Sequence, residues 1–149
     1  MELRFISEKT INGLSTRTDN ATEMDPNKGK IGALWQTFDE TVPVDYKNGE
    51  RVYGVYSDYE SDHTGQFTVL AGFDGASFPS SSNLESKTIP EGNYLVFKYK
   101  GEMPQIAIDA WTEVWSYFSQ GKVEHQRLYS TDFEFYPNGN EIEVHIAVK

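Results

Sequence analysis

The sequence contains no cysteine, which excludes disulfide bonds, thiolate metal sites and thiol nucleophiles. Basic residues are also scarce, with 13 Lys and Arg against 23 Asp and Glu and a formal net charge of −10. A surface of this sign repels phosphate backbones and anionic membranes, so neither nucleic acid nor membrane is expected as a direct partner. The acidity fits a need for solubility as well as an attraction for cations.

Long apolar runs are missing too. No segment approaches the length of a membrane span, and the first residues lack the basic and apolar regions of a signal peptide. We therefore expect a cytoplasmic protein.

Motifs of catalysis and metal binding are equally absent. His63, His125 and His145 do not have the spacing of a metal site, and no nucleophile elbow or phosphate-binding loop occurs. His145 alternates with the apolar residues of 142–148, so we expect it to face away from the core and to be solvated. The sequence predicts no catalytic residue, no metal and no cofactor.

Aromatic residues, in contrast, are abundant. Three Trp, nine Tyr and nine Phe make up 14% of 149 residues, a length that suits one domain over 1–149. Aromatic side chains fill cores first, but a surplus suits a pocket whose walls stack against a ligand.

Two segments have the apolar spacing of amphipathic helices. Ile31, Leu34, Trp35 and Phe38 form the first stripe; the second comprises Ala107, Trp111, Val114, Trp115 and Phe118. Pro104 suits the start of the second helix and Gly121 suits its end.

The other apolar segments predict strands, and turn residues separate them. The expected strands cover 50–56, 66–73, 93–99, 130–136 and 142–148. The Ser-rich stretch 78–86 is the one candidate linker.

The two halves of the chain resemble each other. The tripeptide at 9–11 recurs at 87–89, the first helix matches the second when Trp35 is set against Trp115, and the strand 67–73 matches 142–148. Two pseudo-repeats, about 1–77 and 87–149, would each have the order βαββ. The expected fold is α+β: an antiparallel sheet with two helices and a ligand cleft between the halves.

The strand 130–136 contains the most informative residue. Alternation places Asp132, Glu134 and Tyr136 on one face, with Phe133 and Phe135 on the other. Glu134 therefore lies on an exposed sheet face or inside a concavity. A carboxylate buried in a concavity without a partner takes up a proton or pairs with a cationic ligand.

The tryptophans Trp35, Trp111 and Trp115 lie on the apolar stripes of the two helices, where each fits the core or a ligand-binding wall. In the strand 50–56, Tyr53 and Tyr56 face opposite sides, so only one of them can point into a given cleft.

Several motifs match a known family. The segment 88–97, TIPEGNYLVF, resembles the T-I-P-x-G-x-Y-x-x-F signature of gyrase-inhibitor-like effector-binding domains, the ligand-sensing modules of AraC-type and MerR-type multidrug transcription regulators. The resemblance continues through the helix 104–118, the segment 130–134 and the end of the chain. The first half matches at 31–38 and 52–55. Among free-standing members, the chain is most similar to the integron-cassette-encoded type, which binds cationic drugs.

This resemblance implies a tandem βαββ fold with the ligand between the halves. It also implies that Glu134 is the pocket glutamate and that Tyr53 and Tyr136 are pocket aromatics. Trp111 and Trp115 belong to the second helix of the family pattern, and the resemblance does not decide which one faces the ligand. The function so implied is non-enzymatic binding of a small, cationic, aromatic ligand.

Two other functions stay open at the level of the sequence. Glu134 could act as the general base of a small-molecule hydrolase. The protein could also act on a target or regulator by binding it. The chain offers no room for a DNA-binding domain, so transcriptional control would require a separate regulator or DNA-binding protein.

Overall fold

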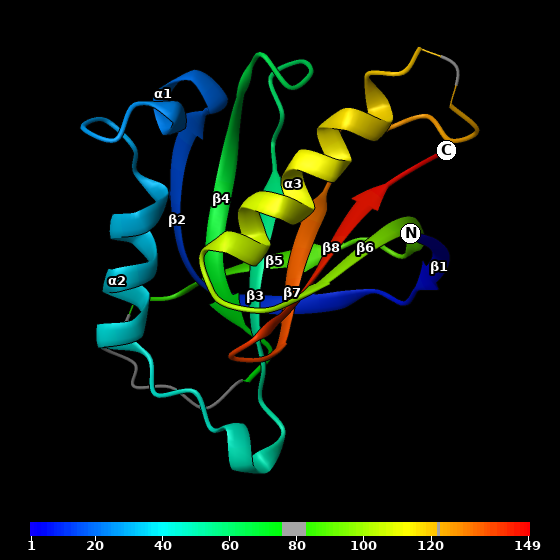
Figure 1. Cartoon of the computed structure of the whole chain (residues 1–149). Helices are drawn as coiled ribbons and strands as arrows, with labels where there is room; N and C mark the ends of the chain where they lie inside the picture. Colours follow the sequence, from blue (N-terminus) through cyan, green and yellow to red (C-terminus); the bar gives the residue numbers. More distant parts are fainter. Residues whose placement is uncertain (76–82, 122) are drawn as a thin grey trace.

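The computed structural model describes residues 1–75, 83–121 and 123–149. These residues form one antiparallel sheet with helices packed against it (Figure 1). The strands are β1 Glu2–Ile6, β2 Lys9–Asp19, β3 Val52–Ser57, β4 Gln66–Phe73, β5 Glu85–Ile89, β6 Gly92–Lys100, β7 Asp132–Asn138 and β8 Glu141–Ala147. The helices are α1 Asn20–Met24, α2 Ile31–Thr41, α3 Gln105–Phe118 and the 3₁₀ turn η1 Tyr46–Asn48.

The strand order is symmetric about the centre of the sheet. It runs β1-β6-β8-β7-β3-β4-β2-β5, so β3 and β7 lie side by side in the middle. Outward from this pair, β4 and β2 on one side mirror β8 and β6 on the other. The tandem βαββ arrangement predicted from the sequence is therefore confirmed, whereas the limits of the repeats, 1–77 and 87–149, stay a prediction.

The short strands β1 and β5 lie at the two edges of the sheet, and each pairs with a strand from the other half of the chain. β1, at the start of the chain, pairs with β6 of the second half, and β5 pairs with β2 of the first. The two similar tripeptides are neighbours in consequence, because Lys9 lies opposite Ile89 and Ile11 lies opposite Lys87.

The two long helices form where the apolar stripes predicted them. α2 packs on β2 and β4 and buries Leu34 and Phe38, and α3 buries Ile106, Ala110 and Val114 against β6 and β8. Both helices follow the predicted ranges closely. The short helix α1 was not predicted; Asp19 caps it by accepting a hydrogen bond from the backbone nitrogen of Thr22 at 2.7 Å.

The face of the sheet away from the helices is also apolar. Ile11, Val55, Leu70, Ile89 and Phe133 are all at most 3% exposed and pack together there. Burial of both faces explains why β3 and β4 are mostly apolar rather than strictly alternating.

The prediction that His145 is solvated is wrong. Its side chain is buried in β8, and its ring stacks on Phe133 with the ring centroids 4.2 Å apart. The alternation rule failed because β8 has core residues on both of its faces. Burial lowers the pKa of His145 to about 4, so the ring is neutral at pH 7.

The predicted linker 78–86 falls largely on residues 78–82, which lie outside the described residues. Its last two residues, Glu85 and Ser86, belong to β5. Among the described residues, no helix is long and apolar enough to span a membrane.

Candidate ligand-binding site

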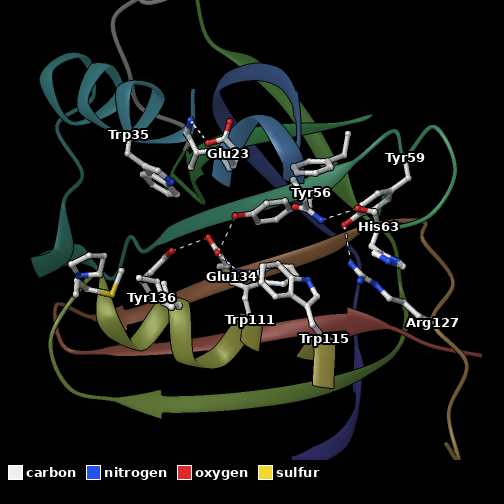
Figure 2. Close-up of a pocket in the computed structure, with 18 residues that line it drawn as sticks. Glu23, Trp35, Tyr56, Tyr59, His63, Trp111, Trp115, Arg127, Glu134 and Tyr136 are labelled. Carbon is white, nitrogen blue, oxygen red and sulfur yellow. Dashed lines mark hydrogen bonds between the residues drawn. The ribbon is translucent and has the colours of Figure 1, made fainter. Parts of the chain in front are cut away.

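A cavity of about 400 Å³ lies between α2 and α3, with the central strands β3 and β7 as its floor (Figure 2). Ile31 and Trp35 of α2 form one wall, and Ala107, Trp111 and Trp115 of α3 form another. The volume and the apolar lining are typical of small-molecule pockets.

Glu134 lies at the base of this cavity and is only 3% exposed. Its Oε2 accepts hydrogen bonds from Nε1 of Trp111 at 2.7 Å and from the hydroxyl of Tyr56 at 3.0 Å. Its Oε1 accepts one from the hydroxyl of Tyr136 at 2.8 Å. Figure 2 shows these side chains converging on the carboxylate, from α3, β3 and β7. Both oxygens are thus held in place by neutral donors.

The electrostatic state of Glu134 follows from this environment. Burial raises its pKa above the ordinary range, and the hydrogen bonds from Trp111, Tyr136 and Tyr56 oppose that rise. Among the described residues, no Lys, Arg or His forms an ion pair with it. Burial next to this carboxylate also raises the pKa of Tyr56 and of Tyr136, so both remain hydroxyl donors. The ionised carboxylate is hydrogen-bonded but not neutralised.

Gly54 makes room for this carboxylate. It lies directly opposite Glu134 in the pairing of β3 with β7. A Cβ at Gly54 would lie 2.5 Å from Oε1 of Glu134 and 3.1 Å from Cζ2 of Trp35. The missing side chain therefore allows the carboxylate and the indole to lie against the strand.

Aromatic rings surround the carboxylate. Trp35 contacts Tyr136 edge to face at a centroid distance of 5.7 Å, and Trp111 contacts Tyr56 in the same way at 5.0 Å. Trp115 lies beside Trp111 and is 41% exposed. The cavity thus offers ring faces and edges on more than one side.

Arg127 brings a positive charge to the wall, but that charge is already paired. Its Nη2 lies 2.9 Å from Oδ2 of Asp132, and the two side chains are 6% and 0% exposed. Asp132 also accepts hydrogen bonds from the hydroxyl of Tyr59 at 2.6 Å and from the backbone nitrogen of Ala147 at 2.8 Å.

A second carboxylate in the wall, Glu23, has backbone partners. Its side chain accepts hydrogen bonds from the backbone nitrogens of Lys30 and Ile31 and from the hydroxyl of Thr18. The N-cap residue Lys30 makes no capping hydrogen bond with its own side chain. Glu23 therefore accepts the hydrogen bonds of the free backbone N–H groups at the start of α2.

The structure brings together five of the six residues proposed from the sequence: Trp35, Trp111, Trp115, Glu134 and Tyr136. The sixth, Tyr53, lies on the opposite face of the sheet beside Phe133 and Phe135, where its hydroxyl accepts a hydrogen bond from Lys9 at 3.0 Å.

Tyr56 occupies the position that Tyr53 was expected to fill. The sequence showed that only one of the two could face a cleft. Choosing between them required the pairing of Gly54 with Glu134, which puts Tyr56 on the carboxylate side.

Tyr59 and Arg127 also line the cavity and were not predicted, because they come from segments without a periodic pattern. No group of three or more His, Asp or Glu in the described ranges could hold a metal ion.

A curled tandem βαββ sheet that holds an aromatic cavity between its helices defines the class of effector-binding domains. Within that class, the chain belongs to the Cass2 family of integron-associated effector binding proteins, whose family model matches residues 3–148.

Solved structures agree with this assignment. The integron cassette protein VCH_CASS2 from the mobile metagenome of Vibrio cholerae is 41% identical, with a TM-score of 0.90 over 99% of this chain and 95% of that one. SAV2435, solved with tetraphenylphosphonium, has a TM-score of 0.71 at 18% identity over 99% and 93% of the two chains. The C-terminal domain of EcmrR has a TM-score of 0.54 at 14% identity over 99% and 96%. These two distant structures show the shared fold alone. A search of curated proteins found no match.

Proposed function

We propose that this protein binds lipophilic organic cations in the cavity between α2 and α3, with the positive charge next to Glu134. The observation that carries the proposal is the state of this carboxylate, which is 3% exposed, hydrogen-bonded by three neutral donors and without an ion-pair partner among the described residues. SAV2435, which shares the fold, was solved with such a cation, tetraphenylphosphonium.

The aromatic walls suit the rest of such a ligand. Trp35, Tyr56 and Trp111 present ring surfaces around the carboxylate. A cation over a ring face gains about 0.5–2 kcal/mol for each well-placed ring. One charge contact and several ring contacts do not define a single molecular shape, so the proposal includes broad specificity.

The proposal is tested with two probes of nearly equal shape, methyltriphenylphosphonium and the neutral triphenylphosphine oxide. The cation should bind at least tenfold more tightly at pH 7, because only it pairs with the carboxylate. Calorimetry measures both affinities, and quenching of the cavity tryptophans provides a second readout. Equal affinities would contradict the proposal. The hydrolase alternative, in which Glu134 activates water, is tested separately with an electrophilic strained-ring probe such as an epoxide, whose ring opening to a diol would be recovered as product.

The role of Tyr56 in tuning Glu134 gives a second prediction. Only the ionised carboxylate pairs with a cation, so cation binding is lost as pH falls through the pKa of Glu134. The Tyr56 hydroxyl lowers that pKa, so Tyr56→Phe should move the midpoint of this loss to higher pH. The measurement is the affinity for methyltriphenylphosphonium from pH 4 to pH 8.

Tyr53→Phe is the matched control, because it removes a hydroxyl from the same strand on the opposite face of the sheet. Its midpoint should stay that of the unmodified protein. Equal shifts in the two variants, or a shift to lower pH in Tyr56→Phe, would exclude the proposed contact.

EcmrR has been solved in a complex with DNA. With a net charge of −10, this chain is poorly suited to touch DNA itself. Where ligand binding affects transcription, we propose that a separate DNA-binding protein supplies the contact.

A further inference from the structure

A second cavity, of about 760 Å³, lies directly beside the ligand cavity and is here called the outer chamber. Its lining includes Trp35, Asp39, Tyr46, Arg51, Met103 and Tyr136. Trp35, Met103 and Tyr136 also line the ligand cavity, so these three side chains form the partition between the two spaces.

The partition is not rigid throughout. Trp35 and Tyr136 contact each other edge to face, and Tyr136 is tied to Glu134 by its hydroxyl. Met103, in contrast, is 43% exposed and has the unbranched, flexible side chain that adapts most readily to a new neighbour. A narrow, linear ligand could pass between the two spaces by displacing this one side chain.

The outer chamber has a carboxylate of its own. Asp39 lies one helical turn beyond Trp35 on the same face of α2, a spacing that places the two Cβ atoms about 5–6 Å apart. Its side chain is exposed and has no hydrogen bond or ion pair with the described residues. It lies close enough to Tyr46 to raise the pKa of that hydroxyl, second only to the effect of burial.

The chamber also contains a guanidinium, but it is already engaged. Nη1 of Arg51 donates hydrogen bonds to the backbone carbonyl oxygens of Tyr46 at 3.1 Å and Glu50 at 2.8 Å. Its Cζ lies 5.9 Å from the centroid of the Tyr46 ring. These neutral acceptors hold the guanidinium near the ring of Tyr46 without cancelling its charge. Asp39 is the negative charge of the chamber, with the rings of Trp35, Tyr46 and Tyr136 around the same space.

We propose that the outer chamber is a second subsite, which binds the distal cation of elongated bis-cationic ligands whose first cation lies at Glu134. The inference rests on the proposed function and extends it to a particular ligand class. A carboxylate among aromatic rings is the chemistry that recognises a quaternary ammonium group. Two linked contacts strengthen binding only when the linker spans both sites, so affinity depends on spacer length.

The test compares linear probes of equal chain length. An alkyltrimethylammonium has one charge, and the matching α,ω-bis(trimethylammonium)alkane has two. A third probe replaces the second ammonium with a carboxylate. Beyond a threshold length, the bis-cation should bind roughly three- to tenfold more tightly than the mono-cation. Equal affinities at every length would overturn the proposal. If the carboxylate probe bound more tightly than the bis-cation, the proposal would also be overturned, because the chamber would then select an anion at Arg51.

Variants separate the second subsite from the first. Asp39→Asn should bring the affinity ratio of bis-cation to mono-cation down to near one. Glu40→Gln removes the same charge from the adjacent residue of α2, outside both cavities, and should leave the ratio unchanged. If both substitutions lowered this affinity ratio equally, the tighter binding of the bis-cation would come from general surface charge, and the second subsite would be rejected. If the mono-cation did not bind, or if its affinity were unchanged by Glu134→Gln, the proposed function itself would be rejected.

Discussion

Replacing Glu134 with glutamine should weaken the binding of an organic cation by about 2–3 kcal/mol, or roughly 30- to 150-fold. The carboxylate is buried without an ion-pair partner among the described residues, so a bound cation gains a charge contact that water does not screen. Glutamine keeps the shape of the side chain and loses the charge. Calorimetric titration with methyltriphenylphosphonium at pH 7 measures the change.

Two controls give this result its meaning. The affinity for neutral triphenylphosphine oxide should change little, because that probe makes the same ring contacts without the charge. The variant should also be at least as stable as the unmodified protein at pH 7, since it removes a buried charge whose ionisation burial opposes. Parallel losses for both probes would mean that the substitution deforms the cavity. An unchanged affinity for the cation would place the charge contact elsewhere.

Arg127→Met should destabilise the fold by about 3–5 kcal/mol. The substitution removes the cation from a pair whose side chains are 6% and 0% exposed. Among the described residues, Asp132 would then keep only the Tyr59 hydroxyl and the backbone nitrogen of Ala147 as partners for its buried charge. Two residues before Glu134 on the same face of β7, Asp132 also helps to fix the strand that holds the pocket carboxylate. Urea denaturation measures the free energy of unfolding.

Lys87→Met is the matched control for this substitution. It removes the cation from the exposed pair Lys87–Asp58, whose atoms lie 2.8 Å apart and whose side chains are 31% and 57% exposed. Solvent screens such a pair, so the expected cost is below about 1 kcal/mol. Similar costs for the two substitutions would show that burial does not set the energetic weight of the Arg127–Asp132 pair.

Much of the architecture follows from local patterns in the sequence. Strong apolar stripes located α2 and α3, and similar segments in the two halves indicated a tandem arrangement that the strand order confirms. Glu134 stood out because it interrupts an aromatic strand. The resemblance to effector-binding domains placed it in a pocket, and the structure puts it at the base of a cavity.

Other features of the site and the core depend on which strands become neighbours in the sheet. Local sequence patterns do not show this pairing. Tyr56 rather than Tyr53 reaches Glu134 because Gly54 pairs with Glu134 across β3 and β7. His145 is buried because the sheet carries core packing on both faces. One partner of Asp132 comes from a distant segment for the same reason: Tyr59 lies far before it in the chain.

The crossed placement of the edge strands has a consequence for ligand capture. The edge strand β1 of the first half pairs with β6 of the second, and the edge strand β5 of the second half pairs with β2 of the first. The two halves therefore cannot move apart by a hinge motion without breaking backbone hydrogen bonds at the edges of the sheet. For the proposed ligands we therefore expect differences in size to be accommodated by rotation of individual exposed side chains at the rim, above all Met103 and Trp115.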